Sequence, residues 1–481
     1  MNRVLFSIDN KMLDQIHSTS LELLGDTGIR FPNKEALEIF KHHGFKTDGE
    51  MVFFRNEDIE KAIKTVPETF KLHARNENNS FVIGDDSYRM APGYGPPFII
   101  ENSGEMRNAV LDDTKKFCKL VQTSKALDFN SSIVAQPNDV PAETAHLDML
   151  LSTMLLTDKP LMGSTSSKTC AQESLEMARM IWGNTDKPVM LNLVDSLSPL
   201  QYAEEMVDAL LVYAKAKQPL IIHSSCSMGS SGPITLAGSL VISNACTLAG
   251  ICLTQLVNPG TPVVYGLGGS PTDMKTGGYV NASPEDAKHT AIVTALGRYY
   301  HIPCRSQGAL TESFSLDYQA GMESSMMLTT AALSGVHVSL HACGTYGSML
   351  AMSFEKFIAD EDLCCAIKKL MKPIEFNEDA FAMELIKKLG TSGNYLIEPH
   401  TAMRCRSEFY IPDLNIRTLH SKWLEMDPRQ IDQRASQLLK KRLLAYEKPD
   451  IDPLIEKDLI KYVENKKDFL SRHVVPDYFQ K

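Results

Sequence analysis

The chain has 481 residues, of which 43% are hydrophobic and 22% are charged, and its formal net charge is −10 at pH 7. This length allows one large domain or two to three ordinary ones, and the composition is that of a globular protein with a large core. The acidic balance argues against nucleic-acid binding, which needs a basic face to neutralise phosphates.

The chain opens with polar residues rather than with the pattern of a signal peptide. The apolar run at 235–257 comes closest to membrane-spanning length, but serine, asparagine and glutamine interrupt it. We therefore expect a cytoplasmic protein with no membrane partner. Its ten cysteines would lie in a reducing compartment, where disulfides are not expected.

Residues 1–127 predict an N-terminal extension that is partly helical and partly β-rich. Helical spacing of apolar residues covers Ser7–Leu24, Asn33–His42 and Asn56–Thr65, and the asparagine that opens each of the last two can cap its first turn. A β-rich stretch follows, and within it glycines and prolines surround Tyr94 and Phe98, which indicates a shaped loop.

Residues 128–372 alternate between short apolar runs and longer helical segments. The runs predict strands at 132–135, 161–165, 189–194, 220–224, 263–267, 303–307 and 336–342. The segments between them predict helices at 142–157, 171–182, 200–215, 234–257, 284–300 and 317–333. Continuous alternation of this kind favours an α/β fold, a (β/α)8 TIM barrel, whose eighth strand the pattern does not locate. Residues 373–481 predict a C-terminal helical region, with a charged helix at 428–446.

The active site of such a barrel lies at the C-terminal ends of its strands. The predicted strand ends carry mostly small and polar side chains, among which we single out Asn192, His223, Tyr265, Gln307 and His341. These residues can line a pocket and orient a ligand without strong acids or bases. Phosphate-loop, dinucleotide-binding and serine-hydrolase motifs are all missing from the sequence.

Two histidine–cysteine pairs leave a zinc site as an alternative. His223 is three residues from Cys226, and His341 is two residues from Cys343, so thiolate and imidazole ligands could converge at the barrel mouth. Packing or hydrogen bonding inside the mouth explains the same spacing, and we predict no bound metal.

Four aromatic residues lie in glycine-rich or strand-end positions: Tyr94, Phe98, Tyr265 and Tyr346. Aromatic faces attract quaternary ammonium ions by about 0.5–2 kcal/mol per contact. Tyr94 is the strongest candidate, because it lies between two glycines and near three prolines, with little local core to join.

The sequence resembles the trimethylamine methyltransferase superfamily along nearly its whole length. The segment Tyr265–Gly277 is similar to the family's "mDmktG" stretch, and Asp317–Glu323 is similar to "D-x-Q-A-G-x-E". The segment Leu396–Thr401, with Arg404, Arg406, Glu408 and Pro412 behind it, resembles the C-terminal "HT…R-x-E…P" signature, and His17–Ile29 is similar to the family's N-terminal region.

The archetype of this family demethylates trimethylamine and carries pyrrolysine near the segment that here reads Gln307–Ser313, with standard residues only. The chain therefore resembles the branch without pyrrolysine, whose glycine betaine, proline betaine and carnitine methyltransferases feed a cognate corrinoid protein in anaerobic bacteria. The resemblance implies methyl transfer from a quaternary amine to cobalt, no tightly bound cofactor, and a homo-oligomer.

Such a substrate already has a neutral tertiary amine as its leaving group, so the reaction needs desolvation and orientation rather than proton transfer. Under this interpretation Tyr94 and Tyr265 form a cation cage with Phe98 behind them, and His341 contacts a betaine carboxylate. His223, Gln307 and Asn192 are further candidates for that polar role, and Tyr346 closes over the ligand.

Three other functions fit parts of the pattern. A zinc-dependent methyltransferase of a thiol or methanol-like substrate would use the histidine–cysteine pairs. A non-catalytic betaine-binding protein would keep the cage without the transfer. A barrel lyase or aldolase would need a strand-end lysine, for which Lys275 is the one candidate.

Overall fold

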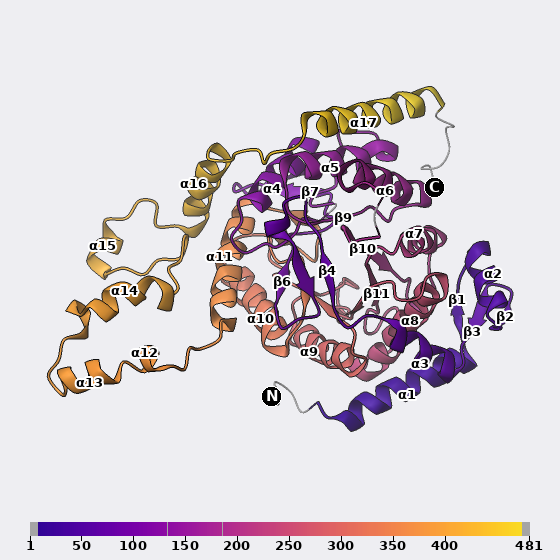
Figure 1. Ribbon diagram of the computed structural model, residues 1–481, viewed down its shortest axis with the longest axis horizontal. Helices are drawn as coiled ribbons and strands as arrows, with labels where there is room; N and C mark the ends of the chain where they lie inside the picture. The colour runs from indigo at the N-terminus through magenta and orange to yellow at the C-terminus, as the bar shows by residue number, and fades with distance from the viewer. Residues whose placement is uncertain (1–7, 132, 185, 474–481) are drawn as a thin grey trace.

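The computed structural model describes residues 8–131, 133–184 and 186–473, and its centre is a closed barrel of parallel strands (Figure 1). Seven strands pair in the order β6-β14-β13-β12-β11-β10-β9. Their bounds are β6 (Arg89–Met90), β9 (Leu161–Met162), β10 (Met190–Asp195), β11 (Leu220–Ser225), β12 (Val263–Gly268), β13 (Cys304–Gln307) and β14 (Val338–Leu340). The predicted TIM barrel is thus confirmed.

A short segment at 128–130 closes the barrel between β6 and β9. The backbone N–H of Asp128 donates to the carbonyl of Met90 at 2.8 Å, and Asn130 bridges to Leu161 in parallel. The strand expected at 132–135 is wrong, because residues 133–135 are irregular; Ser132 lies outside the described residues.

The strand that the sequence did not locate is β6, which pairs with β14. It lies before residue 128, so the expected boundary between extension and barrel divides the barrel itself. A strand of two residues has no alternation to recognise, and neighbouring strands define it.

Helices form the outer ring, as the alternation of strands and helices predicts. The ring consists of α5 (Ala142–Leu156), α6 (Lys168–Trp182), α7 (Glu204–Lys215), α8 (Leu236–Val257), α9 (Pro284–Tyr299) and α10 (Tyr318–Ser334). By length and composition α8 could cross a membrane, but 72% of its most apolar window is buried inside the protein. It packs between the barrel and three helices of the N-terminal extension, so it is a core helix.

The N-terminal extension covers one side of the ring. It contains α1 (Asn10–Asp26), α2 (Lys34–His42), α3 (Asn56–Thr65) and the small sheet β1-β3-β2 (Ile29–Arg30, Met51–Phe53, Lys46–Asp48). Asn33 caps α2 as expected, by accepting from the N–H of Ala36. The cap expected from Asn56 is wrong, because Arg55 occupies the N-cap position of α3.

The hairpin of β4 (Phe70–Leu72) and β5 (Phe81–Ile83) closes the N-terminal end of the barrel. Its aromatic and aliphatic side chains join one apolar cluster with the first inward-facing residues of the strands, among them Met162, Ile221 and Val264. Because this end is filled, a ligand can reach the interior through the opposite end. A second sheet, β15-β16-β7-β8 (Thr345–Tyr346, Ala351–Met352, Phe98–Ile100, Met106–Asn108), follows the C-terminal end of β14.

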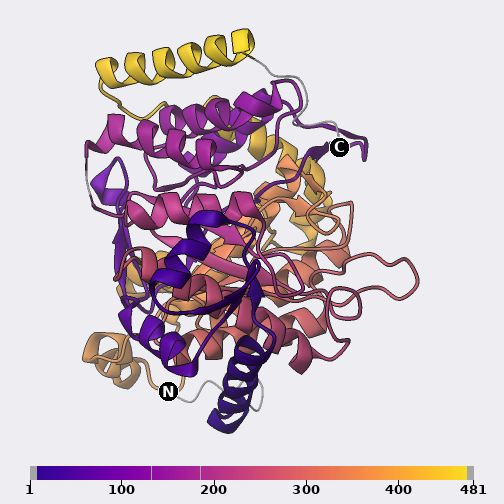
Figure 2. The same cartoon turned by 90° about the vertical axis from the view of Figure 1, so that its right-hand side faces the viewer.

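The C-terminal region has three parts: helices that pack on the outer ring, a projecting arm and a last helix. Helix α11 (Phe354–Met371) completes the ring beside α10, and α16 (Ile431–Leu444) packs on α11 and α4 (Leu111–Gln122). Helix α17 (Pro453–His473) lies across α5 and α6 (Figure 2). Between α11 and α16, residues 373–427 form an arm that extends away from the barrel at the left of Figure 1 and carries α12 to α15 (Glu378–Phe381, Met383–Leu389, Pro399–Glu408, His420–Leu424).

Candidate active site

The strand register sorts the inward-facing side chains into rows. In parallel strands, registered neighbours point to the same face, and side chains alternate along each strand. The pairing Asp195–His223–Gly266–Arg305 forms one row across four strands, and Ser225–Gly268 begins the next row toward the C-terminal end. Below them the interior is apolar. The polar rows therefore lie above a closed hydrophobic floor.

Two glycines in this wall make room for the His223 imidazole, and we call the region between this ring and the Arg305 guanidinium the slot. Gly266 lies between His223 and Arg305 in the first row, and a Cβ there would come within 3.2 Å of the imidazole Cδ2. A Cβ at Gly268 would lie 3.0 Å from both His223 Nε2 and the Ser225 hydroxyl. Both positions have ordinary backbone angles, so the absence of side chains serves space rather than chain geometry. The slot is flanked by an imidazole on one side and a guanidinium on the other.

Arg305 is the charged group of the slot. Its side chain is 3% exposed, and its Nε and Nη1 atoms have no hydrogen-bond partner among the described residues. Burial lowers the pKa of the guanidinium to about 10, against the attraction of Asp195, Tyr279 and Asp286. Buried polar groups are almost always hydrogen-bonded, and a buried cation needs an anion. These unpaired donors are therefore placed for a carboxylate or another anion.

His223 is oriented by a carboxylate. Its Nδ1 lies 2.9 Å from Asp195 Oδ1, which leaves Nε2 turned toward the slot, buried and without a partner in the described part of the chain. The Oε1 atom of Gln307, one row closer to the C-terminal end, is also buried and has no hydrogen-bond partner among the described residues. Together with Arg305, these atoms offer several unused hydrogen-bonding positions within one small region.

His341 and Tyr94 lie together beyond the end of β14. His341 adopts a positive φ of 59°, and its Nδ1 accepts a hydrogen bond from the backbone N–H of Tyr94 at 3.3 Å. The two rings meet edge to face with centroids 6.5 Å apart. Burial lowers the pKa of His341 to about 3, helped by Arg305 and His223, so this imidazole is neutral at physiological pH. An aromatic ring thus lies next to a neutral histidine above the floor.

The segment between β12 and α9 supplies the remaining wall. Burial lowers the pKa of His289 to about 3 and raises that of Asp286 to about 7. The Tyr279 hydroxyl lies 3.3 Å from that of Ser225, which joins this segment to the polar rows. His289 Nε2 has no described partner, and a Cβ on Gly269 would lie 2.6 Å from it. The wall is therefore polar and uncharged apart from Arg305 and the carboxylates near it.

Two residues expected in the site point away from it. Tyr265 is one position out of phase with the inward-facing glycines, and its hydroxyl donates to Asn244 of α8 at 2.8 Å within the layer between strands and helices. Asn192 is likewise out of phase, and its amide donates to the carbonyls of Met190 and Pro219. The cage role expected for Tyr265 and the polar role expected for Asn192 are wrong, because both side chains leave the barrel.

Phe98 and Tyr346 meet each other rather than Tyr94. They pack in a separate cluster with Ile100, Ala320 and Ala351, and Lys356 Nζ lies 5.7 Å from the centre of the Tyr346 ring. The structure therefore brings together four of the eight expected site residues: Tyr94, His223, Gln307 and His341.

The histidine–cysteine pairs do not converge on a common point. The Cys343 thiol faces Cys364 at 3.9 Å in a hydrophobic cluster, whereas His341 faces Tyr94. No group of three or more potential metal ligands occurs among the described residues.

Three residues of the site do not stand out in the sequence pattern: Arg305, Asp286 and His289. The signal for Arg305 was available, because an arginine inside the short apolar strand 303–307 must be buried, and buried arginine is rare unless paired. Asp286 and His289 lie in the first turns of a helix and resemble ordinary capping and surface residues.

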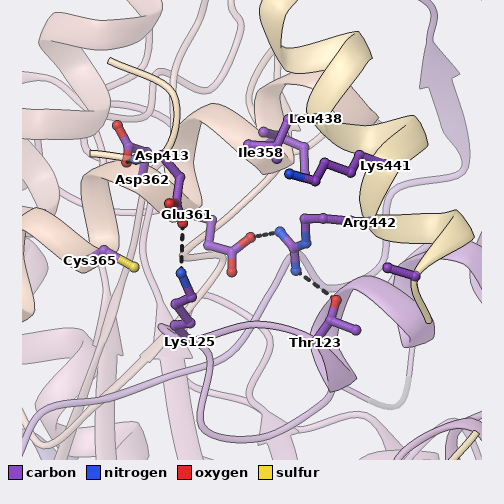
Figure 3. Close-up of a pocket in the computed structure, with 11 residues that line it drawn as sticks. Thr123, Lys125, Ile358, Glu361, Asp362, Cys365, Asp413, Leu438, Lys441 and Arg442 are labelled. Carbon is purple, nitrogen blue, oxygen red and sulfur yellow. Dashed lines mark hydrogen bonds and ion pairs between the residues drawn. The ribbon is translucent and has the colours of Figure 1, made fainter. Parts of the chain in front are cut away.

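A separate cavity of about 270 Å³ lies between α4, α11 and α16 (Figure 3). The ion pairs Lys125–Asp413 and Arg442–Glu361 cross it, and they satisfy the charges of its walls. It contains none of the inward-facing barrel residues, so we assign the chemistry to the barrel mouth.

Comparison with known proteins places these observations in context. A family model described as trimethylamine methyltransferase (MTTB) matches residues 3–471. The chain is 39% identical over 458 residues to the glycine betaine methyltransferase of Desulfitobacterium hafniense (strain Y51), covering 94% of this chain and 95% of the relative. It is 32% identical over 488 residues to the proline betaine:corrinoid methyltransferase of Eubacterium limosum, covering 98% and 97%. Its fold matches the crystal structure of the Methanosarcina barkeri monomethylamine methyltransferase (MtmB) with a TM-score of 0.55 at 10% identity, over 93% and 90% of the two chains.

Proposed function

Since the chain belongs to the trimethylamine methyltransferase family, we propose that it is a quaternary amine:corrinoid protein methyltransferase whose substrate carries a carboxylate. Relatives named for glycine betaine and proline betaine support this activity over nearly the full length. The candidates are glycine betaine, proline betaine, carnitine and similar compounds, and the acceptor is the corrinoid of a separate cognate protein.

Arg305 is the observation that carries the carboxylate. A betaine is a zwitterion, so its site must pair one anionic and one cationic end. The guanidinium is a buried cation whose Nε and Nη1 donors are unpaired among the described residues, and a substrate carboxylate would supply the missing anion and accept charge-assisted hydrogen bonds. His223 Nε2 and the neutral His341 lie in the same interior and add donors or acceptors to the same end. His341 thus keeps its proposed polar role as a partner of Arg305.

Tyr94 is proposed to hold the cationic end. Its ring lies beside His341 above the apolar floor, and a tyrosine face attracts a quaternary ammonium most strongly where water is excluded. With the carboxylate fixed deep in the slot, the N-methyl groups point toward the open end of the barrel. This is the end that a partner protein can approach.

The methyl transfer needs little acid–base chemistry from this chain. The methyl–nitrogen bond breaks with its electron pair on nitrogen, which leaves as a neutral tertiary amine, and a methyl–cobalt bond forms. The reduced corrinoid of the partner supplies the nucleophile. The residues of the slot orient the substrate and exclude water, which accounts for a wall of mostly neutral side chains.

The test is a panel of N-methylated substrates offered with reduced cognate corrinoid protein, followed by the absorbance change of the cobalt. We expect methylation with at least one betaine and much slower transfer with choline, which lacks the carboxylate. Transfer from trimethylamine but from no betaine would overturn the proposal. Binding of betaine without any transfer would identify a binding protein instead, and activity that requires added zinc would favour the zinc-dependent alternative.

We also propose that the protein acts in the cytoplasm as a homo-oligomer, in which a second copy covers the arm. The arm at 373–427 leaves large apolar side chains on the surface, for example Phe376 at 76%, Leu396 at 80% and Ile397 at 78% exposed. Large exposed apolar side chains concentrated in one segment are typical of subunit interfaces. The corrinoid protein must leave after each turnover, so it is less suited to cover the arm.

Sedimentation of the purified chain tests this interface. We expect a dimer or larger assembly for the wild type and a smaller species for the double variant Leu396→Glu, Ile397→Glu. The single variant Lys440→Glu on the exposed surface of α16 is a matched control, because replacing one lysine by glutamate changes the net charge by the same −2. A monomeric wild-type protein would refute the proposal.

A further inference from the structure

We propose that Cys170 is a nucleophilic thiolate, activated by His146 and Glu173, and that it is a site of covalent modification by soft electrophiles and hydroperoxides outside the barrel interior. This site takes no part in the proposed methyl transfer, so it stands or falls on its own evidence.

The first observation is the position of Cys170 on its helix. Ser167 is the N-cap of α6, and its hydroxyl accepts from the backbone N–H of Cys170 at 3.1 Å. Cys170 is thus the third residue of a helix of 15 residues. Unpaired N–H groups and the helix dipole favour a negative charge in this first turn, and they are a recurrent means of activating cysteines.

The second observation is a histidine–carboxylate pair directed at the thiol. His146, on α5, has its Nε2 atom 2.7 Å from Glu173 Oε2, and both side chains are buried. Cys170 and Glu173 are three residues apart on α6 and therefore lie on the same face of the helix, and His146 is electrostatically coupled to the Cys170 thiol. A nucleophile, a base and a carboxylate that orients the base therefore lie close together, as in enzymes that activate a cysteine.

The electrostatics agree with this geometry. Burial acts to raise the pKa of the Cys170 thiol, but the hydrogen bond and charge of His146 lower it below its usual value. Burial acts to lower the pKa of His146, yet its bonds to Cys170 and Glu173 raise it to about 9. Both shifts favour a thiolate beside an imidazolium over a neutral thiol beside a neutral imidazole.

Cys365 and Cys405 are also partly exposed and provide a comparison for the reactivity of Cys170. Among the described residues Cys170, Cys365 and Cys405 are the partly exposed cysteines, whereas the other seven are buried. Cys365 lies in the wall of the cavity of Figure 3, where burial and the neighbouring Glu361 raise the pKa of its thiol to about 12. The chain thus contains its own unreactive reference thiol.

Helix α17 connects this site to the C-terminal part of the chain. Lys466 approaches Glu173 at 3.1 Å and Glu176 at 3.7 Å, and Tyr462 donates to Glu176. These are the charged and titratable groups that α17 directs at the site. Modification of Cys170 removes the negative charge of its thiolate next to His146. It therefore changes the net charge of the residues that α17 packs against.

The proposed reaction with a hydroperoxide is a two-electron oxidation. The thiolate attacks the terminal oxygen, a sulfur–oxygen bond forms, and the oxygen–oxygen bond breaks. The leaving alkoxide or hydroxide takes the proton of the His146 imidazolium, and the product is a sulfenic acid, which a low-molecular-weight thiol converts to a mixed disulfide with release of water. The same thiolate displaces iodide from iodoacetamide without any oxidant.

Competitive labelling tests the proposal on the full-length protein. Limiting iodoacetamide at pH 7, with mass spectrometry of the peptides, should alkylate Cys170 at least about tenfold faster than Cys365 and Cys405, since a larger thiolate fraction outweighs the lower nucleophilicity of an acidic thiol. The rate at Cys170 should rise less steeply between pH 7 and 8.5 than the other two rates.

The variants His146→Gln and Glu173→Gln should slow labelling of Cys170 toward the rate of Cys405. His17→Gln is a matched control, because His17 is another buried histidine with a glutamate at 2.9 Å and is remote from α6. Equal labelling of Cys170 and Cys405 in the wild type would overturn the proposal. So would unchanged labelling of Cys170 in either Gln variant with a native circular dichroism spectrum. The wild-type comparison decides the question even where a variant fails to fold.

Discussion

Replacement of Arg305 by methionine tests separately whether the guanidinium binds the substrate and whether it stabilises the fold. Methionine has nearly the length of the arginine stem and no charge, so it preserves packing inside the barrel while it removes the anion-binding group. If the guanidinium waits for a substrate carboxylate, the variant should bind betaine poorly and yet fold at least as stably as the wild type.

Both magnitudes follow from the surroundings of Arg305. Burial, partly offset by the attraction of nearby acidic groups, lowers its pKa from 12.5 to about 10, which corresponds to a net electrostatic cost of about 3 kcal/mol at about 1.36 kcal/mol per unit. Removing this cost should leave the ligand-free variant equally stable or up to about 3 kcal/mol more stable. Hydrogen bonds to charged groups contribute about 1.5–3 kcal/mol each, so losing two of them should weaken betaine binding by about 10²- to 10⁴-fold.

Calorimetric titration with glycine betaine and with choline measures both parts. The wild type should prefer betaine strongly, and Arg305→Met should bind the two ligands with similar weak affinity, because only the carboxylate interaction is lost. Thermal unfolding without ligand measures the stability. Wild-type betaine affinity in the variant would refute the carboxylate assignment, and a large loss of ligand-free stability would show that the guanidinium is a structural ion-pair partner.

Five further variants have expected outcomes. Tyr94→Ala should abolish methyl transfer with native circular dichroism, and wild-type turnover would remove the cage assignment. Gly268→Ala should narrow the slot and raise the Kd for betaine about tenfold, as titration would measure. Tyr265→Phe should leave this Kd unchanged and lower the free energy of unfolding by about 1 kcal/mol, as denaturation would measure. The pKa of Asp286 is raised to about 7, so the folded chain keeps a proton that the unfolded chain loses above pH 3.8. The free energy of unfolding should therefore fall by about 4 kcal/mol as the pH rises from 4 to 7. Asp286→Asn should remove that fall. The pKa of His341 is lowered to about 3, so its contribution has the opposite sign: stability should fall as the pH drops below 6.5, and less so in His341→Gln, as denaturation at pH 4 and pH 7 would test.

The alternation of strands and helices was readable because each element is long and buried in a repeating way. The run at 220–224 and the segment 234–257 correspond to β11 and α8 within two residues at each boundary. By contrast β6 has two residues, and its identity depends on its pairing with β14, which no local pattern contains.

The sequence alone determined the barrel, the family resemblance and the presence of polar residues at the strand ends, because periodicity and local motifs encode all three. Only the tertiary structure decided which of those residues face one another. Side chains on a strand alternate between its two faces, so a shift of a single position sends Tyr265 into the helix layer and leaves Gly266 on the inner face beside His223 and Arg305. That row exists only once the strands are in register, and register is fixed by contacts between residues distant in the chain.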